Sequence, residues 1–426
     1  MKTKLICLPA ALLMLSACGD EIETAKVTKQ TTAAAPQTTT AASTTVTTTT
    51  ATAAATAKAP EKKKEELTLE YKTDLEVFEK ITLGELITKT NAEINAPDTV
   101  VDTNKVGEQK IKVSLTLNGE KLEKELTCTV TDRTAPVFLS GDYISVPVGS
   151  TADLSDVGLY ADNYDPYPTL SVSESVDTSY AGTHQVQVTL SDSSGNTDTR
   201  TVTVEVVEQV PSFIQPDNGS LSFSDYMSMY QGGGADVGID VSAWQGVIDF
   251  NAVASEGCNF VMIRAAHCSG GYNTGVDDYF PQNLDNALSA GLDCGVYFYS
   301  ADNDPEEVRA HAQWLVDTLA GRKLAMPIAF DWEDFGNFRS YGMSLHDLNE
   351  LYRVFKAVVE GAGYRCMLYG SRNFLKTAWD TDGEDVWLAH YVSQTDYDGQ
   401  YSLWQTGVGT ISGINGLVDL DVRYSH

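Results

Sequence analysis

Residues 327–333 read Pro-Ile-Ala-Phe-Asp-Trp-Glu, a short apolar run that ends in two acids. In a β-strand, successive side chains point to opposite faces, so Ile328 and Phe330 share one face. Asp331 and Glu333 share the other face and lie at the carboxyl end of the strand. The run therefore predicts a strand with one apolar face and one acidic face.

Seven further segments of the C-terminal region have the composition of short strands. They cover residues 237–241, 260–265, 295–299, 367–369, 386–391, 403–406 and 418–422. Helical patterns lie between the early ones, for example over 304–319 and 344–362. Strands that alternate with helices predict a parallel sheet, and eight of them predict a closed barrel.

The last part of this region departs from the regular alternation. The segments between Tyr391 and Leu403 and between Thr406 and Val418 are too short for a helix and two loops. We therefore expect residues 235–426 to form an irregular, TIM-like (β/α) barrel whose helices cover only its first part.

Acids recur on two other predicted strands. Asp240 lies opposite the apolar residues of 237–241, and Asp419 and Asp421 lie opposite those of 418–422. Barrel enzymes place their active sites at the carboxyl ends of the strands. Crowded carboxyls raise one another's pKa, so one of them is expected to keep its proton near neutral pH. A protonated acid beside an ionised one is the arrangement that glycosidic cleavage requires.

Several motifs of this region resemble glycoside hydrolase family 25, the muramidases with an irregular (β/α) barrel. They occur in one order: Gly238-Ile239-Asp240-Val241-Ser242, Arg264-Ala265, Asp277 with Phe280, Ala290-Gly291-Leu292, Gly295-Val296-Tyr297, Asp331-Trp332-Glu333, Trp387-Leu388-Ala389-His390-Tyr391, Trp404-Gln405 and Val418-Asp419-Leu420. Each motif alone is weak, and the ordered set is specific. The resemblance covers the final domain and none of the remaining chain.

The resemblance implies hydrolysis of the β-1,4 bond between N-acetylmuramic acid and N-acetylglucosamine in peptidoglycan. It implies that Glu333 is the general acid and that Asp331, Asp240 and Asp419 complete the catalytic cluster. It favours assistance by the acetamido group of the substrate, while the sequence leaves retention or inversion open. Two positions differ from the family pattern: Asp421 stands where Asn is usual, and Thr406 where an aromatic residue is common.

Aromatic residues near the strand ends are expected to stack on sugar rings. The predicted substrate-binding set comprises Tyr297, Trp332, Tyr369, Trp387, Tyr391, Trp404, Gln405 and Asp421. No cofactor and no metal are expected, because the sequence has no His-Glu-x-x-His motif and no zinc-ligand spacing.

The N-terminus resembles that of a bacterial lipoprotein. Two lysines and a short apolar run precede Leu15-Ser16-Ala17-Cys18, which resembles a lipobox. Residues 1–17 are therefore expected to be a signal peptide, with Cys18 lipidated. Residues 18–66 are rich in Thr and Ala and are expected to form a disordered stalk.

An internal repeat follows the stalk. Residues 101–107 recur as 176–182, and alternating apolar residues follow each copy. Residues 67–132 and 133–207 are therefore expected to be two small β-sandwiches. They resemble immunoglobulin-like repeats of bacterial surface proteins and would act as spacers or as weak wall binders. A linker over residues 208–234 is expected to lead to the barrel.

The composition restricts the partners of the chain. A net charge of −30 argues against nucleic acid, because an acidic surface repels phosphate. Cys258, Cys268, Cys294 and Cys366 permit three disulfide pairings, and buried free thiols are an equal alternative.

The sequence as a whole predicts a muramidase anchored by lipid at the outer face of a bacterial membrane and reaching peptidoglycan. Three alternatives stay open. The barrel could bind wall glycan without cutting it, it could cleave chitin-like polymers, or the β-modules could act in adhesion with the barrel as a passenger.

Overall fold

The computed structural model describes residues 65–150, 159–208, 221–230, 234–268 and 274–424, with the backbone of Ser43–Thr45. The predicted signal peptide, Cys18, most of the stalk and most of the 208–234 linker lie outside these residues. Within them, no helix is long and apolar enough to cross a membrane. Residues 65–134 with Ser194–Asn196 form one compact unit, and the other described residues from Ala135 onward form a second.

The first unit is built on a long hairpin. Strands β6 (Gly107–Leu117) and β7 (Glu120–Thr131) pair antiparallel, with β5 (Glu93–Ile94) beside β6 and β3 (Asp74–Glu76) parallel to β7. A smaller sheet holds β2 (Leu69–Lys72) between β4 (Ile87–Thr90) and β1 (Ser43–Thr45), and helix α1 (Leu83–Leu86) precedes β4. Strand β1 lies inside the segment expected to be a disordered stalk, so that expectation is wrong for these three residues.

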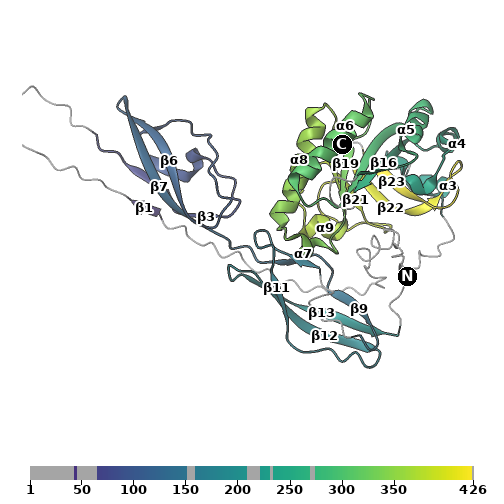
Figure 1. Cartoon of the computed structure of the whole chain (residues 1–426), viewed down its shortest axis with the longest axis horizontal. Helices are drawn as coiled ribbons and strands as arrows, with labels where there is room; N and C mark the ends of the chain where they lie inside the picture. The colour runs from purple at the N-terminus through teal and green to yellow at the C-terminus, as the bar shows by residue number, and fades with distance from the viewer. Residues whose placement is uncertain are drawn as a thin grey trace, which may run out of the picture. The chain divides into compact units, whose positions relative to one another are not determined.

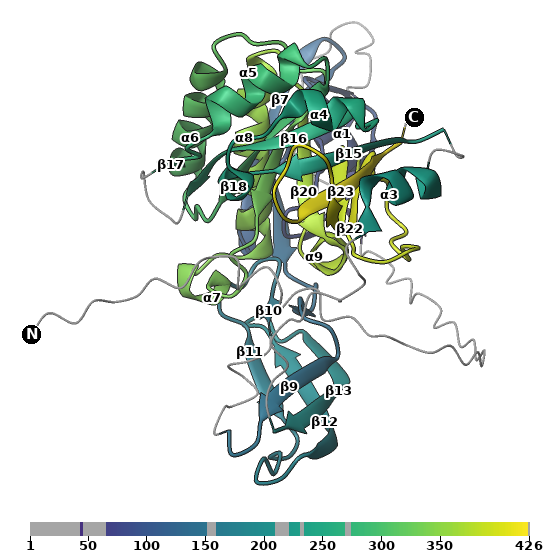
Figure 2. The ribbon, with the colours of Figure 1, turned by 90° about the vertical axis from the view of Figure 1, so that its right-hand side faces the viewer.

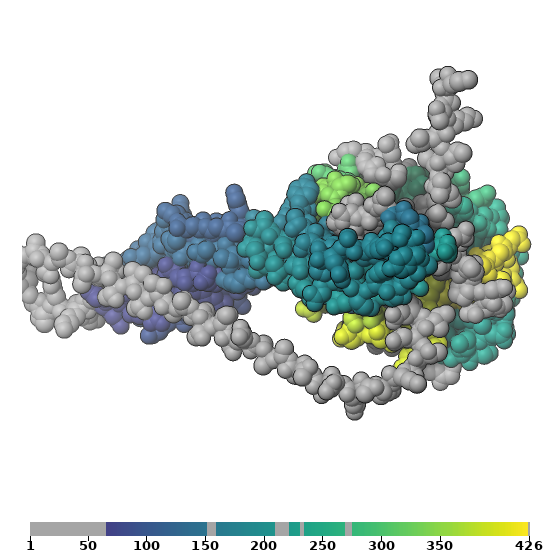
Figure 3. All heavy atoms as spheres, turned by 90° about the horizontal axis from the view of Figure 1, so that it is seen from below, coloured from purple at the N-terminus to yellow at the C-terminus, as the bar shows by residue number. Residues whose placement is uncertain are grey.

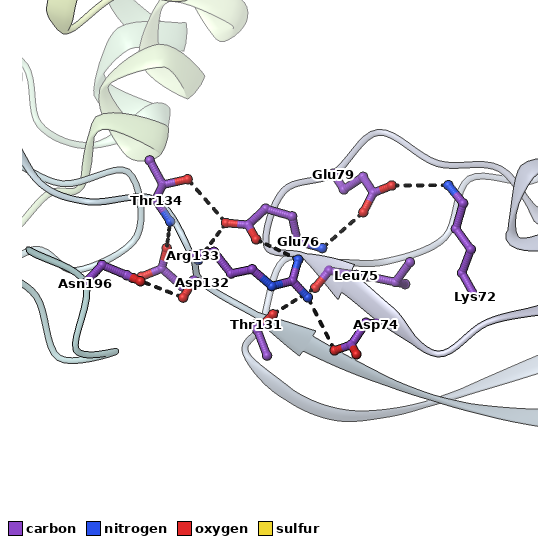
Figure 4. Close-up of polar contacts among 10 residues, drawn as sticks. All are labelled: Lys72, Asp74, Leu75, Glu76, Glu79, Thr131, Asp132, Arg133, Thr134 and Asn196. Carbon is purple, nitrogen blue, oxygen red and sulfur yellow. Dashed lines mark hydrogen bonds and ion pairs between the residues drawn. The ribbon is translucent and has the colours of Figure 1, made fainter. Parts of the chain in front are cut away.

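An exposed polar cluster closes the end of β7. Arg133 forms ion pairs with Asp74 at 3.3 Å and Glu76 at 3.2 Å, as Figure 4 shows. Asn196 donates a hydrogen bond to the carbonyl of Asp132 at 3.1 Å. Exposed ion pairs contribute only about 0–1 kcal/mol each, so the buried hairpin residues, not this cluster, stabilise the unit.

The second module, residues 135–193 and 197–208, repeats the plan of the first. Strands β12 (Gly182–Ser191) and β13 (Thr197–Val207) form its hairpin, flanked by β11 (Thr169–Val172) and by β9 (Tyr143–Pro147), which is parallel to β13. Strands β8 (Val137–Phe138) and β10 (Tyr160–Ala161) form a separate pair. The atoms of this module are among the blue to teal spheres in Figure 3, as its colour bar shows by residue number. The matching strand orders confirm the internal repeat predicted from the sequence.

The C-terminal region forms a closed barrel. Its strands are β15 (Asp236–Val241), β16 (Phe260–Cys268), β18 (Asp293–Ser300), β19 (Ile328–Trp332), β20 (Cys366–Ser371), β21 (Val386–Ala389), β22 (Leu403–Thr410) and β23 (Val418–Arg423). Neighbours from β15 to β22 pair parallel, whereas β23 pairs antiparallel with both β22 and β15 and closes the barrel. The barrel therefore does not follow the regular eightfold (β/α) pattern. The irregularity lies in the last strands, after Tyr391, where the sequence predicted it.

Two short strands extend the barrel sheet. Strand β14 (Leu221–Ser222) pairs with β22, and β17 (Thr274–Val276) pairs with β16. Figures 1 and 2 show the ribbon of the barrel, whose sheet these two short strands extend.

Helices cover the outside of the early strands. They are α4 (Phe250–Ser255), α5 (Phe280–Ser289), α6 (Pro305–Leu319), α7 (Phe338–Tyr341), α8 (Leu345–Gly361) and α9 (Arg372–Thr377), with the short 3₁₀ helix η3 (Ala243–Gln245) after β15. Figure 2 shows α5, α6 and α8 grouped on one side, and α3 (Phe223–Tyr230) beside β22 and β23. Helices α6 and α8 begin at capping residues Asp304 and Ser344, whose side chains accept backbone N–H bonds.

The second module also contacts the barrel. The backbone N–H groups of Leu345 and His346, at the start of α8, donate to the carbonyls of Asp162 at 2.7 Å and Asn163 at 3.2 Å. The guanidinium of Arg339 lies 4.6 Å from the ring centre of Tyr160. The first N–H groups of a helix have no partner inside the helix, so the module supplies acceptors that α8 otherwise lacks.

The cysteines of the described region form no disulfide bonds. Cys128, Cys258, Cys268, Cys294 and Cys366 are all buried and unbridged. Of the two alternatives left open by the sequence, the structure therefore has the buried thiols.

Candidate active site

Three strands bring their acids to one end of the barrel. Asp331 lies on β19, and Glu333 follows that strand directly. Asp240 on β15 is paired in register with Asp419 on β23. Because β23 runs antiparallel, its first residues lie beside the carboxyl end of β15. This reversal lets an acid from the start of one strand meet acids from the ends of two others.

Asp331 and Glu333 form a buried pair of acids. Asp331 is only 2% exposed, and burial, followed by the charge of Glu333, raises its pKa well above the usual value. Burial, followed by the charge of Asp419, raises the pKa of Glu333 to about 7. Oδ1 of Asp331 and Oε2 of Glu333 have no hydrogen-bond partner among the described residues. Two buried oxygens without donors are suited to holding a proton or accepting one from a substrate.

Asp240 is held by a chain of hydrogen bonds. The side-chain amide of Gln405 donates to Oδ2 of Asp240 at 2.7 Å, and the hydroxyl of Tyr369 donates to Oε1 of Gln405 at 3.0 Å. Burial, followed by repulsion from Asp419 and Asp421, raises the pKa of Asp240 well above its usual value. Gln405 and Tyr369, predicted to bind substrate, are thus placed at the acids, and their contact with substrate stays a prediction.

Asp419 lies closer to solvent than Asp240. The hydroxyl of Tyr391, itself 38% exposed, donates to Oδ1 of Asp419 at 2.7 Å. Burial raises the pKa of Asp419 to about 6, and the Tyr391 hydrogen bond opposes that rise. Tyr391 therefore lies at the opening of the site, where contact with a sugar is sterically feasible.

A cation that the sequence prediction omitted lies beside the acids. Arg264 continues the inward-facing series of β16 that includes Phe260 and Met262, and its charge lowers the pKa of Asp331. Its Nε donates to Oδ2 of the buried Asp277 at 3.1 Å. The alternation of β16 was the signal that could have identified Arg264 as a site residue.

We expect Arg264→Met to reduce kcat/KM by about 10–100-fold, the usual effect of losing a side chain that orients catalytic groups. Loss of the cation also removes an interaction that lowers the pKa of Asp331, so we expect the shape of the pH–rate profile to change. Steady-state rates across pH measure both effects. Arg264→Lys, which retains a charge, serves as the control, and an unchanged profile in Arg264→Met would contradict this role.

Two predicted substrate-binding tryptophans face away from the site. Trp332 alternates with Asp331 along β19 and packs outside the barrel against Phe335 and Phe338. Trp404 also packs outside the barrel, and its Nε1 donates to the carbonyl of His390 at 2.9 Å. The prediction that they stack on sugars is wrong, because strand alternation places them opposite the acids.

Two other members of that set lie beneath the site. Trp387 is 1% exposed and Asp421 is fully buried, so neither offers surface to a polymer in this structure. Trp387 packs edge to face on Tyr297 and Tyr369, with ring centres 5.7 and 4.8 Å apart. These four residues form the floor of the acidic cluster. Trp244 on η3, by contrast, is 67% exposed.

One further polar cluster lies behind the strands. The thiol of Cys268 donates to Oδ1 of Asp302 at 3.0 Å, and Nδ1 of His311 lies 2.8 Å from Oδ2. These three groups are close enough to share a metal ion. Their direct hydrogen bonds already satisfy the Asp302 carboxylate, and the Asp302 carbonyl accepts from Trp332 Nε1 at 2.8 Å. The cluster therefore supports the outer packing of Trp332.

Comparisons with known proteins find relatives of the C-terminal part of the chain. Residues 239–414 match the family described as Glycosyl hydrolases family 25. An autolytic lysozyme of Clostridium acetobutylicum is 31% identical over 188 residues, covering 43% of this chain and 54% of the relative. Lysozyme M1 of Streptomyces globisporus is 27% identical over 197 residues, covering 43% and 65%. The chain thus spans about half the length of the first of these relatives.

Solved structures are also similar to the C-terminal part of the chain. A family 25 glycosyl hydrolase from Bacillus anthracis is 23% identical, with a TM-score of 0.39, and the match covers 45% of this chain and 89% of that one.

Proposed function

We propose that this chain, whose residues 239–414 belong to the family 25 glycosyl hydrolases, is a muramidase that hydrolyses the β-1,4 bond between N-acetylmuramic acid and N-acetylglucosamine. The proposal rests mainly on one observation. At one end of the barrel, the strands bring together four acids: Asp331, Glu333, Asp240 and Asp419. The lysozyme names of the relatives support peptidoglycan as the substrate.

The environments of the acids support their separate roles. Glu333, with a pKa of about 7, keeps its proton near neutral pH and can donate it to the leaving oxygen. Asp419, with a pKa of about 6, is mostly ionised at the same pH and stabilises positive charge on the sugar ring. Asp331, next to Arg264, is assigned to orient the 2-acetamido group or the attacking water.

We propose that the enzyme is located at the outer face of the bacterial membrane. The sequence of Leu15–Cys18 supports a lipid anchor, and the Thr-rich segment after it supports a stalk. The two β-modules are proposed to be immunoglobulin-like and to extend the barrel toward the wall. Their repeated hairpins support this assignment.

Release of reducing sugar from purified peptidoglycan tests the proposal. We expect the wild-type chain to release reducing ends from peptidoglycan faster than from chitin oligomers. A faster reaction on chitin would favour the chitinase-like alternative. Binding to peptidoglycan without any release of sugar would favour the non-catalytic binder.

The pKa values of Glu333 and Asp419 predict a narrow pH optimum. Activity requires Glu333 protonated, so kcat/KM falls above about pH 7; it requires Asp419 ionised, so kcat/KM also falls below about pH 6. Tyr391→Phe removes a hydrogen bond that lowers the pKa of Asp419. We therefore expect the acidic limb of the Tyr391→Phe pH–rate profile to move up by about 0.5–1 pH unit, which corresponds to the free energy of one hydrogen bond. The alkaline limb is expected to stay unchanged. A pH–rate profile in which both limbs move together would contradict this assignment.

A further inference from the structure

The carboxyl of Asp421 is a buried group that the proposed reaction does not use. It is fully buried on β23 and faces the barrel interior, two residues beyond Asp419. Nε1 of Trp387 donates to its Oδ1 at 2.8 Å. Its Oδ2 has no hydrogen-bond partner within the described part of the chain. One oxygen is therefore satisfied, and the other lacks a donor.

Another acid, Asp240, lies on the adjoining strand β15, where it is paired in register with Asp419, two residues before Asp421. The carboxyls of Asp421 and Asp240 lie close enough to affect each other's pKa, and neither has a proton to donate when it is ionised. Asp240 already accepts from Gln405 through Oδ2. A hydrogen bond between the two carboxyls therefore requires one proton between them.

The remaining groups around Asp421 do not neutralise it. Asp419 on the same strand adds a second negative charge, and the charge of Asp421 raises the pKa of Tyr226 on α3 and of Cys258 before β16. Arg423, also on β23, is held by Asp236 at 2.6 Å and Asp293 at 2.8 Å. Trp387, which donates to Asp421, and Gln405, its register partner on β22, are both neutral. An ionised Asp421 would thus be a buried charge without a counter-ion, which is strongly unfavourable.

We propose that Asp421 is a positioning residue whose carboxyl shares a proton with Asp240 and thereby fixes the orientation of Asp240 in the active site. The linkage then runs from Trp387 through Asp421 and Asp240 to Gln405 and Tyr369. The catalytic part of this inference rests on the proposed muramidase function, whereas the shared proton does not depend on it.

The proposal also accounts for the residue found at this position. A protonated carboxyl and a side-chain amide both present one acceptor and at least one donor. An amide at residue 421 would therefore serve Trp387 and Asp240 without needing a proton. In this chain an acid can serve the same two partners, provided that it keeps its proton.

Paired substitutions test the positioning role through activity. We expect Asp421→Asn, which still accepts from Trp387 and donates to Asp240, to keep kcat on peptidoglycan within about threefold of wild type. Asp421→Ala, which lacks both contacts, is expected to lose about 10–100-fold in kcat with a smaller change in KM. Equal activity of the two variants would overturn the proposal. Equal loss in both would also overturn it, because it would mean that the negative charge itself is required.

Thermal unfolding tests the shared proton without substrate. A carboxyl pKa raised in the folded state means that the folded chain holds more protons than the unfolded chain above about pH 4, so stability falls as pH rises. We expect the wild-type unfolding temperature to fall relative to Asp421→Asn between about pH 4 and pH 8. A difference that stays constant with pH would show Asp421 to be ionised throughout and would overturn the proposal. If the wild type releases no sugar, the proposed function fails, and this series still decides the protonation state.

Discussion

Replacing Glu333 by Gln is expected to reduce kcat on peptidoglycan by about 10²–10⁴-fold, the range that general acid catalysis contributes. The amide has nearly the same size as the acid and cannot donate the proton that the leaving oxygen needs. Steady-state release of reducing ends measures the change. Asp421→Asn, a matched acid-to-amide change deeper in the same barrel, is the control and is expected to remain active.

The same variant makes a prediction about stability that separates chemistry from misfolding. Burial raises the pKa of Glu333, so its folded form favours the proton and the wild type loses stability as pH rises toward and through about 7. The glutamine side chain would remove this loss, because an amide does not ionise. We therefore expect Glu333→Gln to unfold at a temperature equal to or above that of wild type at pH 8. An inactive variant that also unfolds at lower temperature would leave the loss of activity explained by damage to the fold and would contradict the assignment of Glu333.

Replacing Trp332 by Ala is expected to destabilise the barrel by about 3–5 kcal/mol, as for other fully buried aromatic side chains. Its ring is completely buried, contacts Phe335, Phe338 and Tyr341, and bonds to the Asp302 carbonyl. Urea unfolding followed by tryptophan fluorescence measures the loss. All six tryptophans lie between residues 244 and 404, so the signal reports on the barrel alone.

Trp244→Ala is the matched control for Trp332→Ala. Trp244 is 67% exposed, so its removal is expected to change stability by no more than about 0.5 kcal/mol. A small change for Trp332→Ala, together with a large rise in KM, would instead restore the interpretation that Trp332 binds sugar. Comparable losses of stability in both variants would contradict the distinction between an outer core residue and an exposed one.

The strands and acids of the barrel were predictable from short-range patterns. The alternation in residues 327–333 was enough to place Asp331 and Glu333 on one face, because side-chain direction in a strand depends only on position. All eight predicted strands occur, with ends that differ by a few residues. The shortage of residues after Tyr391 correctly predicted that the barrel is irregular.

The direction of β23 could not be obtained in this way. The alternation of residues 418–422 is the same whether the strand runs up or down the barrel. Its antiparallel pairing decides that Asp419 lies at the rim and Asp421 below it. Direction depends on contacts between distant segments, so Asp421 was predicted at the substrate and lies buried.

The two outward-facing tryptophans show a second limit of prediction from the sequence. Trp332 and Trp404 were selected as aromatic residues near strand ends, although the alternation that places Asp331 and Gln405 inside places both rings outside. The phase of each strand was therefore more informative than residue type. The same phase along β16 also identifies Arg264 as an inward-facing cation.

Mass spectrometry of peptidoglycan digested by the wild-type chain and then reduced with borohydride tests the central claim most directly. Reduction converts the sugar at each newly formed reducing end into its alcohol, so the fragments identify the bond that was cut. We predict fragments that end in reduced N-acetylmuramic acid and that are absent after digestion with Glu333→Gln. Fragments that end in reduced N-acetylglucosamine, or no fragments at all, would contradict the account.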